Sequence, residues 1–167
     1  MDIKLEIMDI AQKSVLVQLM ELYNYEFSEY EDEDVNEHGY YGYSHIDDYW
    51  NEEGRYPYLI RADGKIAGFA LICSHCHCIT GPDARCFGEF FVMLKYRRNG
   101  IGKKVALALI DQHKGNWEIM HLNNNKKAGN FWNTVINTLL KEKTIDQFSV
   151  CNSDNGGMAG FLFSNLT

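Results

Sequence analysis

The 167-residue sequence predicts an α/β (α+β) fold of about six to seven strands and about four helices. Two observations lead to this class. Short apolar or alternating runs bounded by turn residues alternate with longer segments that repeat apolar residues at helical spacing. In addition, one apolar run leads directly through a basic, glycine-containing turn into a helical pattern. Because no linker or internal repeat interrupts the chain, we expect residues 1–167 to form a single domain.

The elements are assigned from the N-terminus onward. Apolar and charged residues alternate over residues 3–7, which predicts a half-buried strand. Asp9 and Gln12 have the spacing of a capping box before a helix that ends near residue 25 or 27. A short helix capped by Ser44 is expected within residues 44–50. Further strands are expected at residues 56–61, 65–72, 85–93, 117–122, 144–150 and 158–163, with turns at residues 63–64 and 152–157.

Two longer helices follow the basic turn and the fifth strand. Apolar residues recur at helical spacing from Ile101, and Gly115 is expected as the C′ residue that ends this helix. From Ala128 to Leu140 the helical spacing is nearly perfect, and Asn125 is placed to cap the start of that helix.

Composition and charge limit the class of function. The net charge of −7 argues against non-specific nucleic-acid binding. No apolar run approaches the roughly 20 residues that a membrane span needs, and the first residues lack the layout of a signal peptide. We therefore expect a cytoplasmic protein without nucleic-acid or membrane partners.

The five cysteines are expected to be free thiols, because their number is odd and no secretion signal is evident. Cys73 and Cys76 have CxxC spacing, and His75, His77 and Cys78 lie beside them, which is suggestive of zinc. However, no second ligand pair lies at a usual distance, and Cys86 is the only nearby candidate. We therefore expect an ordinary strand end here and no metal site.

An acidic, aromatic segment follows the first helix. Seven acidic residues occur between Glu26 and Glu37 without a basic residue among them, and tyrosines are interleaved with them or follow. Such a run is commonly a solvated loop. It can also form a wall that favours a cationic substrate, because aromatic faces and carboxylates attract ammonium groups. Both interpretations are compatible with the sequence.

The basic turn has the features of an anion-binding site. Gly100 and Gly102 lie where an apolar strand gives way to a helix, and Lys103 and Lys104 follow. The first N–H groups of a helix lack acceptors, and glycine lets an anion approach them. A Walker loop and a dinucleotide fingerprint both fit poorly, because the glycine spacing differs and the hydroxyl of the former is missing.

The turn is similar to a known family signature. Its sequence, Arg97-Arg98-Asn99-Gly100-Ile101-Gly102, matches the R/Q-x-x-G-x-G/A motif of the GNAT N-acetyltransferase superfamily. Residues 125–132 resemble that family's N-x-x-A-x-x-φ-Y helix start, in which φ is apolar. The resemblance implies a mixed central sheet and an acetyl-CoA-dependent N-acetyltransferase. Its acceptor would be a small-molecule or peptide amine that attacks directly in a ternary complex.

The resemblance also implies which residues hold coenzyme A. The backbone of the turn would bind the pyrophosphate, and amides near Val92 and Met93 would bond the pantetheine and the acetyl carbonyl. The resemblance assigns to this site Phe91, Val92, Met93, Arg97, Arg98, Asn99, Gly100, Ile101, Gly102, Lys103, Asn125 and Trp132. Trp132 departs from the family pattern, because a tyrosine that protonates the leaving thiolate is usual there and an indole N–H is too weak an acid.

The remaining assignments concern catalysis and the acceptor. Candidate bases are Glu89 on the strand before the turn, and Glu118 and His121 on the next strand. Candidates for the substrate wall are Tyr25, Tyr30 and Trp50. A homodimer is compatible with the sequence, and a non-catalytic CoA-binding sensor or partner-binding module is the alternative function.

Overall fold

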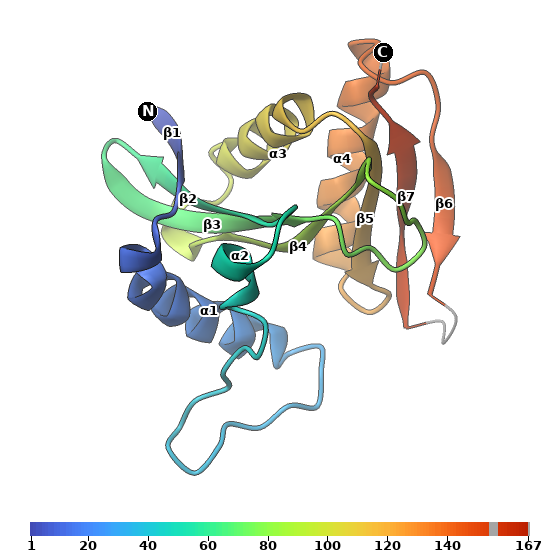
Figure 1. The fold of residues 1–167 in the computed structure, drawn as a ribbon. Coiled ribbons are helices and arrows are strands. Elements are labelled where there is room, and N and C mark those ends of the chain that lie inside the picture. Colours follow the sequence, from blue (N-terminus) through green and yellow to red (C-terminus); the bar gives the residue numbers. More distant parts are fainter. Residues whose placement is uncertain (154–156, 167) are drawn as a thin grey trace.

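The computed structural model describes residues 1–153 and 157–166. The described residues form a seven-stranded sheet with the order β1-β2-β3-β4-β5-β7-β6 (Figure 1). Its strands are β1 Ile3–Ile7, β2 Tyr56–Ala62, β3 Lys65–Cys73, β4 Ala84–Val92, β5 Asn116–Leu122, β6 Ser149–Asn152 and β7 Met158–Ser164. The α-helices are α1 Lys13–Phe27, α2 Asp48–Asn51, α3 Ile101–Gln112 and α4 Lys126–Lys141, and 3₁₀ turns occupy η1 Ile10–Gln12 and η2 Leu94–Tyr96. The predicted fold class is confirmed.

Helices cover both faces of the sheet. On one face α1 and α2 bury a cluster that includes Leu16, Tyr49 and Phe69. On the other face α3 and α4 pack on a second cluster, centred on Trp117 and Val135. Figure 1 shows α1 and α3 on opposite sides of the sheet, and the long segment after α1 extends away from it. None of the helices in the described part of the chain is long and apolar enough to cross a membrane.

The sheet is mixed because β4 and β5 run parallel, whereas every other neighbouring pair is antiparallel. The β4–β5 ladder holds only the pairs Ala84–Asn116, Arg85–Trp117 and Cys86–Glu118. Beyond Cys86 the two strands diverge. Among the described residues, the edge of β4 that faces β5 therefore has no strand partner from residue 87 onward, and it lines an opening in the middle of the sheet.

A β-bulge at Gly88 sets the direction of the β4 side chains. Leu71 of β3 pairs with Glu89, but the next residue, Ile72, pairs with Phe87, so Gly88 is the additional residue. A bulge reverses the alternation of side chains along a strand. Phe87 consequently packs toward α4, whereas Glu89 points toward α1. A larger residue at the bulge would displace Tyr49, because a Cβ at Gly88 would lie 2.5 Å from the Tyr49 hydroxyl.

Three expectations about element ends are wrong. Ser44 does not cap a helix, because residues 44–47 form turns and α2 begins only at Asp48. The side chains of Ile46 and Tyr49 are buried, and they anchor this segment to the sheet. Gly115 is not a C′ residue, since α3 ends at Gln112 with His113 as its C-cap. Gly115 is needed instead because a Cβ there would collide with the Asp83 carbonyl oxygen.

The third correction concerns the strand expected at residues 144–150. β6 begins only at Ser149, where pairing with β7 starts, and Ile145 is buried in the cluster beneath α3 and α4 instead. The turn expected at residues 152–157 lies partly outside the described residues. Asp9 and Gln12 form the expected capping box, although it caps η1, which leads directly into α1.

Candidate active site

A cleft of about 1170 Å³ follows the divergence of β4 and β5. It is bounded by the end of α1, the turn before α3 and the start of α4. The residues proposed from the sequence that line it are Tyr25, Tyr30, Glu89, Phe91, Val92, Arg97, Arg98, Gly100, Ile101, Gly102, Lys103, His121, Asn125 and Trp132. Four others, Trp50, Met93, Asn99 and Glu118, do not line it. The structure thus brings most of the sequence-predicted residues into one cleft.

The start of α3 forms an anion cradle at one end of the cleft. Gly100 is the N-cap residue, with φ of +75° and no side-chain cap. The Lys104 N–H donates to the Gly100 carbonyl at 3.0 Å, so the three preceding N–H groups have no acceptor within the helix. Gly102 lets α3 pack closely against the aromatic residues beside it, because a Cβ there would lie 3.2 Å from the Phe131 ring. Lys103 adds positive charge beside these groups, so this end of the cleft is suited to an anion.

Arg97 fastens this turn to two other elements. Its Nη2 lies 2.7 Å from the Glu26 carboxylate of α1, and its Nε donates to the Val92 carbonyl of β4 at 2.5 Å. Its guanidinium is therefore engaged within the protein. Arg98 is exposed at the mouth of the cleft, and Asn99 donates to the Arg97 carbonyl at 3.2 Å.

The free edge of β4 presents backbone groups to the cleft. The Met93 N–H donates to the Ala67 carbonyl of β3 at 2.8 Å. The Met93 amide is therefore not free to bind the coenzyme, in contrast to the expectation. In an antiparallel pair, successive residues direct their N–H and C=O groups to opposite sides. The Val92 carbonyl accepts from Arg97 and thus points away from β3. The Val92 N–H points to the same side as the Val92 carbonyl, toward the cleft.

The start of α4 forms the opposite wall. Asn125 is buried, and its Oδ1 accepts a hydrogen bond from the Ala128 N–H at 2.9 Å, so it caps the helix. Trp132 is 5% exposed and packs among Phe87, Phe90 and Phe131, with ring centroids 4.8 to 5.5 Å apart. Its large indole fills the aromatic floor of the cleft.

Glu89 projects from β4 toward α1. The Tyr23 hydroxyl donates to its Oε2 at 2.5 Å. Burial raises the pKa of Glu89 to about 7, while hydrogen bonds from Tyr23 and Tyr43 act in the opposite direction and the nearby Glu31 charge raises it further. A carboxylate with this pKa can accept a proton near neutral pH.

The other two candidate bases are placed differently. The Nδ1 of His121 lies 3.0 Å from the Leu122 carbonyl, which can only accept, so Nδ1 is the donor in this contact. The His121 ring lies against Gly129 of α4, on the face opposite to Glu89. Glu118 is fully buried outside the cleft.

Glu118 has a clear structural partner. Its carboxylate accepts the N–H groups of His77, Cys78 and Ile79 at 2.7, 2.6 and 3.2 Å. It therefore holds the loop between β3 and β4 in place at the end of the β4–β5 ladder. Because its carboxylate is bound to these N–H groups and lies outside the cleft, we do not propose Glu118 as the base.

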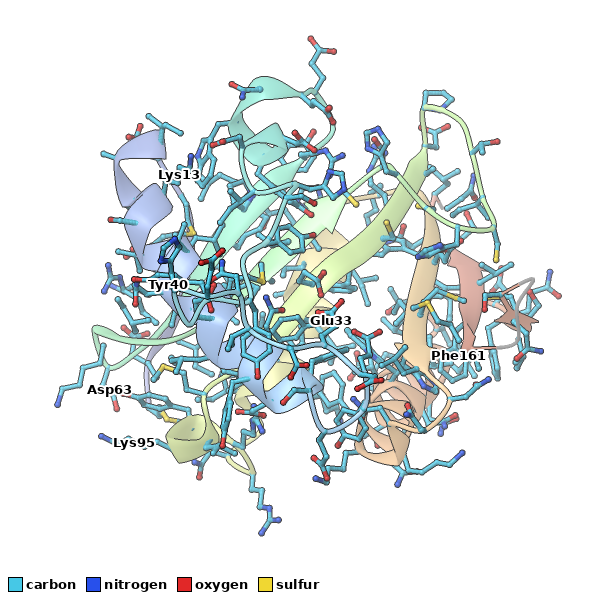
Figure 2. The ribbon with its side chains drawn as sticks, turned by 90° about the horizontal axis from the view of Figure 1, so that it is seen from below. Lys13, Glu33, Tyr40, Asp63, Lys95 and Phe161 are labelled. Atoms are coloured by element: carbon cyan, nitrogen blue, oxygen red, sulfur yellow. The ribbon has the colours of Figure 1, made fainter. Side chains whose placement is uncertain are left out.

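The end of α1 and the first residues of the segment after it border the cleft. Tyr25 and Tyr30 line it, whereas Trp50 donates its indole N–H to the Met8 carbonyl at 2.9 Å and lies elsewhere. The Asn124 side chain donates to the Tyr30 carbonyl at 2.8 Å, which links this segment to the start of α4. Figure 2, seen from the α1 side, shows Glu33 and Tyr40 on this segment, and residues 31–40 are all exposed.

The cysteine cluster lies on the α1 face of the sheet. The Sγ atoms of Cys73 and Cys86 are 3.3 Å apart on neighbouring strands, and the cysteines are free thiols. In residues 1–153 and 157–166, no group of three or more His, Cys, Asp or Glu side chains is arranged to hold a metal ion.

Sequence reasoning missed several residues of this site. Tyr23 and Tyr43 are not among the residues that the sequence singles out, although both face Glu89. Lys127 and Glu29 form an ion pair across the cleft mouth at 3.4 Å. No local pattern signals these partners, because each contact joins residues far apart in the chain.

The fold and this cleft, in which a helix N-terminus lies beside two diverging strands, are those of an acyltransferase. The chain belongs to the acetyltransferase (GNAT) family, whose model matches residues 16–134. The expected family, the acetyltransferase activity and acetyl-CoA as co-substrate are thereby confirmed. A search of the curated proteins found no match.

Solved structures share the fold at low sequence identity. An acetyltransferase from Thermus thermophilus superimposes with a TM-score of 0.69 at 10% identity, over 97% of this chain and 96% of its own. The PaiA N-acetyltransferase from Thermoplasma acidophilum, in complex with coenzyme A, gives 0.64 at 13% identity, over 96% and 98%. An aminoglycoside acetyltransferase AAC(6′)-Ib, in complex with coenzyme A and kanamycin, gives 0.63 at 11% identity, over 98% and 95%.

Proposed function

We propose that this protein transfers an acetyl group from acetyl-CoA to a cationic amine, with Glu89 as the general base. The single observation that carries the proposal is the position of Glu89. Its carboxylate, with a pKa of about 7, lines the same cleft as the anion cradle of α3. A base and a donor site are thus combined where two strands diverge.

The donor site is made from backbone and basic groups. The N–H groups of residues 101–103 would bind the pyrophosphate, with Arg98 and Lys103 adding positive charge. The Val92 N–H would bond the acetyl carbonyl, and Asn125 would contact the coenzyme arm. Acetyl-CoA supplies the thioester, whose carbonyl carbon is the electrophile.

The acceptor amine must lose a proton before it can attack. An ammonium group has no free electron pair, and Glu89 accepts its proton when the carboxyl is ionised. Because the pKa of Glu89 is about 7, a large share of the carboxyl is ionised at neutral pH while it stays basic enough to act. The amine nitrogen then attacks the thioester carbonyl carbon within the ternary complex. The N–C bond forms, the C–S bond breaks, and the nitrogen loses its remaining excess proton to the departing thiolate or to water.

Charge supports a cationic acceptor. Near the α1 end of the cleft, Glu26 pairs with Arg97 and Glu29 with Lys127. In the described part of the chain, the unpaired negative charge there comes from Glu89 and from Glu31, which lies close enough to raise the pKa of Glu89. Tyr25 and Tyr30 contribute aromatic faces that attract ammonium groups. The likeness to a protein in complex with kanamycin, a polycation, agrees with this choice. A small polyamine or aminoglycoside fits this wall, and so does an exposed peptide amine.

The leaving thiolate does not need Trp132. The indole at this position cannot protonate it, and Trp132 packs the aromatic floor instead. A thiolate is stable enough near neutral pH to leave unaided. We therefore assign no protein acid to this step.

Turnover with an amine panel tests the proposal. The protein is incubated with acetyl-CoA and spermidine, kanamycin, or a peptide with a free amine, and free thiol is followed. We expect turnover with at least one of them and loss of turnover in Glu89→Gln. Tight coenzyme binding without turnover across the panel would instead support the alternative, a CoA-binding module. The single domain, the cytoplasmic location and a homodimer stay predictions.

A further inference from the structure

Three tyrosines from three separate elements converge on the bulge of β4. Tyr23 comes from α1, Tyr43 from the segment after it and Tyr49 from α2. Tyr23 is 2.5 Å from the Glu89 carboxylate, and the Tyr43 hydroxyl also faces it. Tyr49 lies against Gly88 and interacts with the Tyr43 hydroxyl. The bulge thus presents Glu89 to a set of phenols rather than to solvent alone.

The rings of Tyr23 and Tyr49 are fixed by packing. Tyr23 is 9% exposed, and its ring packs against Phe27, Phe69 and Phe91 at centroid distances of 4.4 to 5.9 Å. Tyr49 is 3% exposed beneath the Arg55 guanidinium. A phenol held in this way loses little further freedom when it donates a hydrogen bond, so its hydroxyl can orient a carboxylate.

We infer that Tyr23 and Tyr43 are positioning residues, which hold the Glu89 carboxylate in one orientation and favour its ionised form, while Tyr49 holds Tyr43. The inference rests on the proposed role of Glu89 as the base. Without the two hydroxyls, a smaller share of this carboxyl would be ionised at neutral pH, because burial and the Glu31 charge both disfavour ionisation. The tyrosines therefore keep the base usable.

The surroundings of Glu89 explain why these hydroxyls matter. The titratable groups that face it are Tyr23 from α1, Glu31 and Tyr43 from the segment after α1, Tyr49 from α2 and Cys73 from β3. None of these five is basic, so no positive side chain among them offsets the burial of the carboxylate. Hydrogen bonds from the phenols are the stabilising interactions that this set provides.

Titration of Glu89 by NMR tests the inference without an acceptor. Glutamate side chains are labelled with ¹³C at the carboxyl carbon, and Glu89→Gln identifies the Glu89 signal. We expect Tyr23→Phe and Tyr43→Phe each to move its titration upward by about 0.5 pH units or more, since each removes one hydrogen bond to the ionised form. Tyr56→Phe, a tyrosine packed on His113 outside the cleft, is the matched control and leaves the titration unchanged.

Kinetics separate this inference from the proposed function. With an acceptor from the panel, the acid limb of the kcat/KM profile moves upward in Tyr23→Phe and Tyr43→Phe, and the loss is larger at about pH 6.5 than at about pH 9. An unmoved titration in both variants, with Glu89→Gln inactive, overturns the inference alone. Full activity of Glu89→Gln overturns the proposed role of Glu89 itself.

Discussion

The guanidinium of Arg97 lies 2.7 Å from the carboxylate of Glu26, so the turn before α3 is tied to the end of α1. Arg97 was expected to bind the coenzyme, but its Nε also donates to the Val92 carbonyl. Its role in the structure is to hold the turn in the shape that exposes the α3 N–H groups. Its neighbour Arg98 differs, because the Arg98 side chain is exposed and its charge lies at the mouth of the cleft.

Substituting each arginine by methionine separates the two roles. Arg97→Met removes the ion pair and the hydrogen bond, and we expect it to lower the free energy of unfolding by about 1 kcal/mol and to weaken CoA binding. We expect Arg98→Met to leave stability unchanged and to weaken CoA binding at low salt. The difference in affinity from the wild type becomes smaller at high salt, because salt screens the charge of Arg98. Chemical denaturation and calorimetry with CoA measure both. An Arg97→Met protein with normal stability and affinity would contradict this account of the turn.

The raised pKa of Glu89 predicts a stability cost. The folded-state pKa is about 7, against about 4.5 in the unfolded chain, so the folded protein binds more protons between these values. Stability therefore falls as pH rises from about 4.5 to about 7 and then levels off. We expect Glu89→Gln to melt higher than the wild type at about pH 8 and equally at about pH 4.5.

Glu53→Gln is the matched control for that measurement. Glu53 is exposed and lies outside the cleft, so its substitution changes melting little at either pH. If Glu89→Gln shifts the melting temperature equally at both pH values, Glu89 does not have the raised pKa on which its role as base depends.

Glu118→Gln tests the separation of a structural acid from a catalytic one. A glutamine keeps one acceptor oxygen but presents an NH₂ group to the N–H donors of the loop, so we expect a loss of about 2 kcal/mol of stability or more. Turnover well below the melting temperature stays near the wild-type rate. A stable Glu118→Gln protein without turnover would show that Glu118, and not Glu89, handles the proton.

The acidic wall predicts an electrostatic contribution to acceptor binding. Glu29→Gln and Glu31→Gln are expected to raise KM for kanamycin or spermidine several-fold at low salt, with kcat little changed, because they remove attraction and not chemistry. The difference shrinks as ionic strength rises. Glu53→Gln again serves as the control. An equal KM in all four proteins would mean that the segment after α1 is only a solvated loop.

Local sequence patterns predicted the elements well where one face is apolar. The strand at residues 3–7, the β2–β3 hairpin that turns at Asp63 and Gly64, and the two long helices follow directly from the sequence pattern. Element ends that depend on partners were missed: β6 begins at Ser149 because β7 pairs with it there. No local pattern shows where a neighbouring strand starts.

The same limit applies to the site. The turn signature indicated the donor cradle, because its glycines and lysines are contiguous. The direction of Glu89 could not be read from the alternation of β4, since the bulge at Gly88 reverses it. The phenols around Glu89 come from residues 23 to 49, and only the folded chain brings them together.

The central claim is that α3 holds the coenzyme pyrophosphate, and a matched pair of glycines tests it. Gly100 and Gly64 have φ of +75° and +76°, and a Cβ at either meets nothing within 4 Å. Aspartate thus imposes the same backbone strain at both positions, but only at Gly100 does it place negative charge in the cradle. The measurement is the Kd for CoA by calorimetry, with far-UV circular dichroism confirming the fold.

We expect Gly64→Asp to bind CoA like the wild type and Gly100→Asp to raise the Kd for CoA by roughly 100-fold or more. The aspartate carboxylate would repel the pyrophosphate, and its side chain would block access to the α3 N–H groups. A folded Gly100→Asp protein with unchanged CoA affinity would contradict the assignment of the donor site.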